Sequence, residues 1–319
     1  MKIFVIGCGR WGSLITWYLD SIGHEVTLYG RRGSKNMERF LSERRNDLLS
    51  LPESIGLTTE LSDIKDADAV IISIASQALR GLLGELAELS VKNKNFVLCM
   101  KGLEIGSGKR LSEVAEEFLD TTNTVSVWLG PGHVQEFYAG IPNCMVIDGK
   151  SEEVKRRLVD EFSSELIRFY YGNDLIGNEI GGASKNVIGI AAGMLDGFGL
   201  STLKGALMSR GTREIGRLIT ALGGNEISAY GLCHLGDYEA TVFSKYSHNR
   251  QFGESFIKGE GYDQLAEGYY TVKALIDISE AYGVELPICR AVYDVLYENK
   301  PPRETLSSLF SRSLKSEFS

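Results

Sequence analysis

The sequence predicts an α/β protein in which a doubly wound parallel sheet is followed by an all-helical domain. Short apolar segments and helical stretches alternate in the first half, which is the pattern of a parallel sheet covered on both faces. After about residue 175 the apolar residues recur at helical spacing and strand patterns end. We therefore expect two domains, at residues 1–176 and 177–319.

Each predicted element has its own pattern. We expect strands near 2–6, 26–30, 69–74, 96–100, 125–129 and 144–147, with helices near 12–22, 77–88 and 109–119. Segments 69–72 and 96–99 are apolar at every position, as buried parallel strands are. In the second half, one helical stripe consists of Ile180, Ala183, Val187, Ile190, Ala191 and Met194. Pro301-Pro302 predicts the start of a final helix, since proline is tolerated in a first turn.

Composition narrows the class of protein. The chain of 319 residues is 43% hydrophobic and 24% charged, as soluble globular proteins are. Its net charge of −8 argues against nucleic-acid and anionic-membrane partners but leaves room for a local basic pocket. No signal peptide or membrane span is predicted. Five scattered cysteines fit reduced thiols in a cytoplasm, and four isolated histidines predict no metal site.

A glycine-rich loop is the strongest local motif. Gly7, Gly9 and Gly12 form a GxGxxG pattern directly after a predicted strand and before a predicted helix, with Arg10 and Trp11 between them. The first glycine permits a tight turn, the second lets the backbone approach a pyrophosphate, and the third allows close helix–strand packing. The helix N-terminus then offers free N–H groups to the phosphates. The loop predicts a dinucleotide-binding domain in which Gly7, Gly9, Arg10, Trp11 and Gly12 contact the cofactor.

The residues after the second predicted strand bear on the choice of dinucleotide. Sites specific for NAD usually place an acid there, where it binds the ribose 2′-hydroxyl. This chain has Arg31 and Arg32 instead, and guanidinium groups suit a 2′-phosphate. We expect NADP(H) to be favoured, with NAD(H) as the alternative cofactor. A solvated surface pair of arginines is the other interpretation.

Two lysines and an aspartate are candidates for proton transfer. Lys101 ends a predicted strand, and ligands of open parallel sheets bind beyond the carboxyl ends of the strands. Lys185 lies in a helix of small and apolar residues, where desolvation lowers a lysine pKa toward the range used in acid–base catalysis. Asp237 follows Leu235-Gly236 and could orient a lysine or be an ordinary turn residue.

Taken together, these motifs resemble the NAD(P)-dependent glycerol-3-phosphate dehydrogenase family over nearly the whole chain. The matching segments are Gly7–Gly12, Gly23–Val26, Ser76–Leu79, Lys101–Glu104, Gly130–Pro131, Gly181–Val187, Leu235–Asp237, Ser247–Arg250, Phe252–Gly253 and Glu267–Gly268. The resemblance implies a Rossmann domain and a helical domain, a cytoplasmic homodimer, and reversible reduction of dihydroxyacetone phosphate to sn-glycerol 3-phosphate by NAD(P)H.

The resemblance also implies roles for individual residues. Lys185 is the proton donor for ketone reduction and the acceptor for alcohol oxidation, Lys101 binds and polarises the substrate, and Asp237 holds both in one network. Substrate contacts are implied for Gly130, Gly132, Ser247, His248 and Asn249, and cofactor contacts for Lys101, Val134 and Glu267.

Three departures from the family pattern lie on the substrate side. Gly132 stands where the family usually has Ser or Thr, and His133 follows it. The family's Ser-Arg-Asn, whose arginine normally faces the phosphate, is Ser247-His248-Asn249 here. The apolar run expected after Asp237 is replaced by residues 238–240, Tyr-Glu-Ala.

Three functions therefore remain in competition. The first is the family reaction, and the second is reduction of another small phosphate, phosphonate or carboxylate carbonyl compound. The third is a nucleotide-binding or redox-sensing protein without catalysis. A phosphate substrate predicts that Lys101, His248 and Arg250 converge on one pocket, whereas a bulkier or uncharged one predicts open space beside Gly132.

Overall fold

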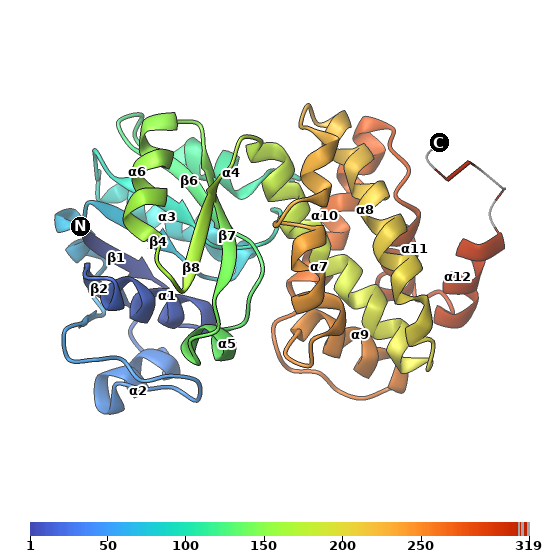
Figure 1. The fold of residues 1–319 in the computed structure, drawn as a ribbon, viewed down its shortest axis with the longest axis horizontal. Helices are drawn as coiled ribbons and strands as arrows, with labels where there is room; N and C mark the ends of the chain where they lie inside the picture. The colour runs from blue at the N-terminus through green and yellow to red at the C-terminus, as the bar shows by residue number, and fades with distance from the viewer. Residues whose placement is uncertain (312, 314–315, 318–319) are drawn as a thin grey trace.

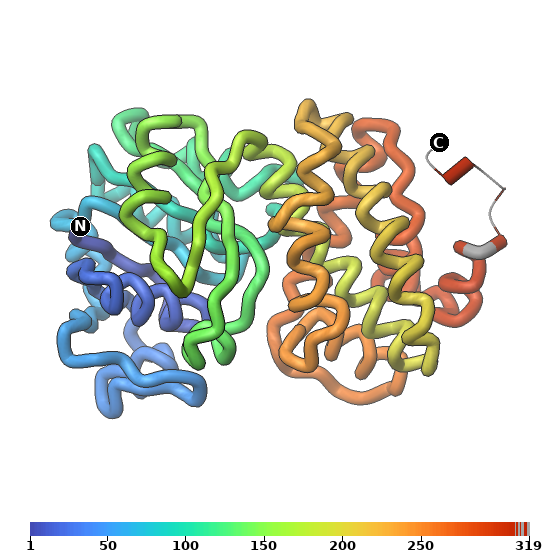
Figure 2. The backbone as a smooth tube through the Cα atoms, in the orientation of Figure 1, coloured from blue at the N-terminus to red at the C-terminus, as the bar shows by residue number. Residues whose placement is uncertain are grey.

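The computed structural model describes residues 1–311, 313 and 316–317. The chain folds into two lobes that lie side by side (Figure 1). The first lobe is a sheet with helices on both faces, and the second consists of helices packed around a long central one. Figure 2 shows that the N-terminal half of the chain forms the first lobe and the C-terminal half the second. The predicted fold class is confirmed.

One eight-stranded sheet organises the first lobe, in the order β3-β2-β1-β4-β5-β6-β7-β8. Its strands are β1 (Lys2–Ile6), β2 (Glu25–Tyr29), β3 (Gly56–Thr58), β4 (Ala69–Ile72), β5 (Asn95–Leu98), β6 (Thr124–Leu129), β7 (Asn143–Gly149) and β8 (Ile167–Tyr171). The order reverses at β1, so the ends of β1 and β4 flank the position where doubly wound sheets bind ligands.

The sheet differs from the prediction in two respects. All neighbouring strands are parallel except β6 and β7, which are antiparallel, with Leu129 opposite Val146. The connection between them holds only the short helix α5 (Val134–Tyr138), and the chain turns back along the same edge instead of crossing over. The sequence pattern also missed β3, which has three residues, and β8, whose Ile167 and Phe169 alternate with exposed neighbours.

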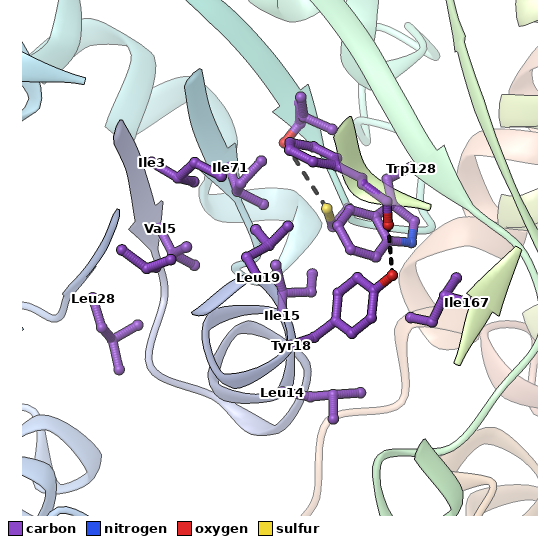
Figure 3. Packing of buried hydrophobic residues seen from close by; sticks show 14 of the residues in the cluster. Ile3, Val5, Leu14, Ile15, Tyr18, Leu19, Leu28, Ile71, Trp128 and Ile167 are labelled. Atoms are coloured by element: carbon purple, nitrogen blue, oxygen red, sulfur yellow. Dashed lines mark hydrogen bonds between the residues drawn. The ribbon is translucent and has the colours of Figure 1, made fainter. Parts of the chain in front are cut away.

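The helices of this lobe are α1 (Arg10–Ser21), α2 (Lys35–Glu43), α3 (Leu79–Glu88), α4 (Leu111–Phe118), α5 and α6 (Glu152–Phe162). Helix α1 buries Leu14, Ile15 and Leu19 against the sheet (Figure 3). Tyr18 of the same helix donates to the carbonyl oxygen of Phe162 at 2.5 Å and packs edge-on against Trp128. This packing fixes the helix whose N-terminus follows the glycine loop.

The second lobe surrounds α7 (Leu175–Gly197), which is buried along most of its length. Its other helices are α8 (Lys204–Ala221), α9 (His248–Lys258), α10 (Glu267–Tyr282), α11 (Pro287–Leu296) and α12 (Pro302–Ser308). Glycines let α7 and α9 touch, since a Cβ added at Gly193 would lie 1.9 Å from the carbonyl oxygen of Arg250. The predicted α7 stripe is fully buried, and the final helix begins at Pro302 as predicted.

A buried carboxylate ties the lobes together. Glu179 of α7 accepts hydrogen bonds from the backbone N–H and the hydroxyl of Ser112 in α4, at 3.0 and 2.6 Å. It also pairs with Arg110 at 2.6 Å. Burial raises the pKa of Glu179, while Arg110 and Ser112 favour its ionised form. The start of α7 is thereby anchored on the sheet lobe, which places the middle of α7 at the cleft.

Candidate active site

The glycine loop joins β1 to α1, and two of its glycines are required by close backbone contacts. Gly7 has φ +116°, and a Cβ there would lie 2.1 Å from the carbonyl oxygen of Ser73. A Cβ on Gly12 would lie 1.9 Å from the carbonyl oxygen of Gly7. Any side chain at either position would therefore collide with backbone. These two residues set the path of the turn.

Gly9 is different, because a Cβ there would meet no protein atom within 4 Å. The space beside it is a cavity of about 610 Å³ at the ends of β1 and β2, which we call the dinucleotide cavity; its lining includes Gly7, Gly9, Arg10, Trp11 and Arg31. Backbone approach without a side chain, next to the N-terminus of α1, is what a pyrophosphate needs. The residues present therefore fit a bound dinucleotide.

The two neighbouring arginines have different surroundings. Arg31 lines the dinucleotide cavity, and its Nη2 lies 3.8 Å from Oε1 of Glu85. Arg32 pairs with Glu60 and is not part of the lining that the described residues form. Both side chains are exposed. Arg31 is thus the arginine of the pair that lines this cavity.

Both candidate lysines meet on one carboxylate. Asp237 ends the short turn Leu235–Asp237, and its Oδ2 lies 2.6 Å from Lys101 Nζ and 3.0 Å from Lys185 Nζ. Lys101 also donates to the carbonyl oxygen of Gly130 at 2.5 Å, and Lys185 donates to Oγ1 of Thr241 at 2.7 Å. Asp237 Oδ1 is buried, and no described group bonds to it. The three predicted catalytic residues are therefore in contact.

The burial of Lys185 has a chemical consequence. Burial lowers its pKa from 10.5 to about 8; Asp237 opposes this shift and Lys101 adds to it. A group whose pKa lies near 8 exists in both protonation states near neutral pH. Lys185 can thus donate or accept a proton under ordinary conditions.

Asparagine side chains brace this cluster. Asn186 Nδ2 donates to the carbonyl oxygen of Lys101 at 2.9 Å, and Asn249 Nδ2 donates to Asn186 Oδ1 at 3.1 Å. Asn249 Oδ1 accepts from the N–H of Gly268 at 2.8 Å. The side-chain amide of Asn249, expected to contact substrate, is therefore engaged in holding α7, α9 and α10 together.

These residues line a second cavity, of about 290 Å³, which we call the lysine cavity. It brings together most of the predicted site: Arg10, Trp11, Lys101, Gly132, Val134, Lys185, Asp237, Ser247, His248, Asn249 and Glu267. Gly130 takes part through its carbonyl bond to Lys101. Glu267 accepts from the N–H of Ser76 at 3.0 Å, and burial raises its pKa.

Ten lining residues were not predicted as site residues, among them His133, Asn186, Thr241 and Tyr246. Two of them have a sequence signal, because Asn186 adjoins Lys185 and Thr241 lies one turn beyond Asp237. Burial lowers the pKa of His133 to about 4, with Lys185 contributing, so its ring is neutral. Its buried Nε2 has no partner within the described part of the chain. Such an atom can be satisfied by a polar ligand.

The structure shows the surroundings of Arg250 and Gly132, which lie in the segments that depart from the family pattern. Arg250 does not join the cavity, because its guanidinium pairs with Asp196 at 2.9 Å and Glu254 at 2.7 Å. The expectation that Lys101, His248 and Arg250 converge is thus wrong for Arg250. Beside Gly132 there is no open space, since a Cβ there would lie 2.2 Å from the ring of Phe137. That space is what a bulkier substrate would need.

The comparisons with known proteins cover both lobes. Residues 2–155 match the model of the NAD-dependent glycerol-3-phosphate dehydrogenase N-terminus, and residues 174–307 match that of its C-terminus. The chain belongs to this family. A relative from Thermoanaerobacter sp., named glycerol-3-phosphate dehydrogenase (NAD(P)+), is 35% identical over 100% of this chain and 99% of its own. A relative of the same name from Thermotoga sp. is 37% identical over 100% of this chain and 99% of its own length.

A solved structure agrees with the family assignment. The glycerol-3-phosphate dehydrogenase of Coxiella burnetii superposes with a TM-score of 0.91 at 27% identity, covering 98% of this chain and 99% of that one. The predicted family is confirmed, and so is the enzyme class, an NAD(P)-dependent oxidoreductase acting on a CH–OH group. This class sets aside the sensor without catalysis.

The described residues form neither a membrane-spanning helix nor a cluster of metal ligands. No helix in the described part of the chain is long and apolar enough to cross a membrane. Across the same residues, no three His, Cys, Asp or Glu side chains gather as metal ligands would.

Proposed function

We propose that the enzyme catalyses the reversible reduction of dihydroxyacetone phosphate to sn-glycerol 3-phosphate, with NADP(H) preferred over NAD(H). The observation that carries the proposal is the shared contact of Lys101 and Lys185 with Asp237, in a cavity that adjoins the dinucleotide cavity. A dehydrogenase needs a proton donor and positive charge at the carbonyl oxygen, beside the cofactor. The three residues supply both.

The cofactor is held by backbone on one side and by side chains on the other. The Gly7–Gly12 loop and the N-terminus of α1 bind the pyrophosphate, with Trp11 beside them. Val134 and Glu267 line the adjoining cavity, which supports a contact of each with the nicotinamide end. When bound, the nicotinamide supplies the hydride for ketone reduction and takes it back in alcohol oxidation.

Lys185 moves the proton. In reduction its ammonium donates a proton from Nζ to the carbonyl oxygen as that oxygen becomes a hydroxyl; in oxidation its neutral amine accepts the same proton. Asp237 and Thr241 hold the amine in place. The amino group of Lys101 binds the same oxygen and stabilises the negative charge that develops there.

The size of the cavity favours a small substrate over the bulkier alternative. Phe137 fills the position beside Gly132, and the lysine cavity holds only about 290 Å³. The protein carries a net charge of −8, yet Arg10, Lys101 and Lys185 gather in this cavity with Asp237 and Glu267. Such a local basic pocket supports an anionic substrate such as a phosphate ester.

The preference for NADP(H) is supported by Arg31. It lines the dinucleotide cavity beyond the end of β2, where the ribose of a bound dinucleotide lies in this fold. A guanidinium there matches a 2′-phosphate.

The family resemblance also supports a homodimer. One chain has a mass of 35.1 kDa, so light scattering separates a monomer from a dimer. A monomer mass at assay concentration would contradict this part of the proposal.

The test is the initial rate of NADPH and NADH oxidation with dihydroxyacetone phosphate. We expect turnover with both cofactors and a higher kcat/KM for NADPH. If neither cofactor is oxidised while fluorescence shows that both bind, the enzyme acts on another substrate. Phosphonate and carboxylate carbonyl compounds are then the panel to assay.

A further inference from the structure

Arg10 occupies an unusual position between the two cavities. It is the first residue of α1, and its half-buried side chain lines the dinucleotide cavity and the lysine cavity alike. Its guanidinium contacts Nε2 of His248, at the start of α9 in the other lobe. The side chain therefore reaches from the cofactor loop to the start of α9 in the helical lobe.

This guanidinium lacks a counter-charge. No carboxylate within the described residues pairs with Arg10, and the one charge effect on it comes from Tyr262. Two other partly buried arginines have carboxylate partners, which are Glu179 for Arg110 and Asp196 for Arg250. Burial lowers the pKa of Arg10, but an arginine keeps its charge at neutral pH. A desolvated charge without a partner is costly unless a ligand supplies the opposite charge.

His248 is arranged to hold Arg10 and not to bind an anion itself. Arginine can only donate, so Nε2 of His248 accepts from it and the ring carries its proton on Nδ1. That N–H is donated to the hydroxyl of Tyr262 at 2.7 Å, and Tyr262 donates in turn to Oε1 of Gln251 at 3.3 Å. Burial lowers the pKa of His248, which favours this neutral form. Both ring nitrogens are thereby engaged.

The two lysines of the lysine cavity, unlike Arg10, each have a carboxylate partner. Lys101 and Lys185 share the carboxylate of Asp237. The pyrophosphate of the cofactor can use the backbone N–H groups at the start of α1, which need no side chain. Among the described residues, Arg10 is thus the cation of the lysine cavity that has no carboxylate partner, and it can bind an anionic group there.

We propose that Arg10 binds the phosphate of the substrate, and that His248 is a positioning residue which holds its guanidinium in the lysine cavity. This inference rests on the proposed function, because it assumes that the substrate is a phosphate ester. It moves Arg10 from the cofactor contacts to the substrate contacts, and it takes His248 out of direct contact with the phosphate.

The experiment compares two ketones that differ only in the phosphate. For Arg10→Ala, we expect kcat/KM for dihydroxyacetone phosphate to fall at least ~10-fold, the scale of a lost charge-assisted hydrogen bond. The kcat/KM for dihydroxyacetone, which lacks the phosphate, and the Kd of NADPH should both equal those of the unmodified enzyme. Arg10→Lys keeps the positive charge but loses the two parallel N–H donors of the guanidinium. Its kcat/KM for dihydroxyacetone phosphate should lie between those of Arg10→Ala and the unmodified enzyme. The matched control is Arg39→Ala, which removes an α2 arginine paired with Asp47.

His248 is tested through its dependence on Arg10. His248→Ala should lower kcat/KM for dihydroxyacetone phosphate, whereas His248→Gln, which retains an acceptor, should recover most of it. In an Arg10→Ala background the His248→Ala change should have no further effect. Equal losses with both ketones, or a weaker NADPH Kd in Arg10→Ala, would place Arg10 at the cofactor and overturn the proposal.

A failure of the proposed function would look different. The unmodified enzyme would then not reduce dihydroxyacetone phosphate at all. The phosphate site is tested in that case by calorimetric titration of inorganic phosphate into the enzyme with NADP+ bound. Binding that Arg10→Ala abolishes supports the site, and equal binding, or none, in both proteins refutes it.

Discussion

The two cavities of the cleft are built in different ways. The dinucleotide cavity is shaped by backbone: three glycines within six residues set a turn, leave space above it and expose the start of α1. The lysine cavity is shaped by charged side chains from distant parts of the chain, since Lys101, Lys185 and Asp237 lie 52 to 136 positions apart. The first depends on steric fit, and the second on electrostatic balance.

This difference has a consequence for substitutions. A backbone site tolerates changes of charge around it but not the addition of an atom in the wrong place. A side-chain site tolerates small changes of shape but not the loss of one member, because the remaining charges are left buried and unmatched. The predictions below test this contrast, from the largest expected effect to the smallest.

The largest effect is expected at the proton donor. Lys185→Ala should lower kcat for ketone reduction by at least ~100-fold, because a general acid is lost. NADPH binding, followed by fluorescence, should persist. Lys150→Ala removes an exposed lysine paired with Glu116 and is the control. A rate near that of the unmodified enzyme would remove Lys185 from the mechanism.

The second largest loss of activity is expected at Asp237, whose carboxylate is shared by the two lysines. Asp237→Asn keeps the shape of the side chain but leaves Lys101 and Lys185 without their common negative charge. We expect kcat to fall on the order of tenfold or more, as when one partner of a buried ion network is neutralised. Because Asp237 raises the pKa of Lys185, the pH profile should also move to lower pH. An unchanged profile would contradict the coupling.

Substitutions in the glycine loop test whether the dinucleotide cavity depends on steric fit. Gly12→Ala would force a Cβ against the carbonyl oxygen of Gly7 and should lower stability by ~1–3 kcal/mol, as overpacking does. Gly9→Ala meets no protein atom and should leave Tm unchanged, but its methyl group enters the cofactor space. It should weaken NADPH binding by about tenfold. Gly81→Ala, in an open position of α3, is the control.

The pH dependence follows from the pKa of Lys185, which is about 8. The donor for reduction is the protonated form, so kcat for reduction should fall as pH rises above about 8. Oxidation needs the neutral amine, and its kcat should rise with pH through the same range. Rates measured in both directions on one buffer series check the prediction. Parallel changes in the two directions would show that another group controls the rate.

The smallest effect is expected at the two arginines after β2. Arg31→Ala should raise the Kd of NADPH roughly 3- to 10-fold, the range of a partly exposed charge-assisted contact, and leave NADH binding unchanged. Arg32→Ala should affect neither cofactor, because Arg32 pairs with Glu60 outside the cavity. Equal changes for NADPH and NADH would mean that Arg31 does not bind the 2′-phosphate.

The sequence predicted the parts of the fold that repeat a local pattern. The strands β1, β2, β4, β5 and β6, the glycine loop and the buried stripe of α7 follow from apolar periodicity and turn chemistry. It predicted a strand at β7 but not its antiparallel direction, and it missed the short β3, because strand direction and pairing depend on how the connection returns to the sheet. Family resemblance identified Lys101, Lys185 and Asp237, which spacing alone left open.

By itself, then, the sequence determined the fold class, the dinucleotide loop and the enzyme class, since each depends on residues that are neighbours along the chain or on a family pattern. Only the tertiary structure decided which charges face one another. Arg250 pairs with Asp196 and Glu254, and Asn249 bonds to Asn186. Arg10 meets no carboxylate among the residues that the structure describes. Such pairings act over a few ångströms of space between lobes, and no local pattern of residues contains those distances.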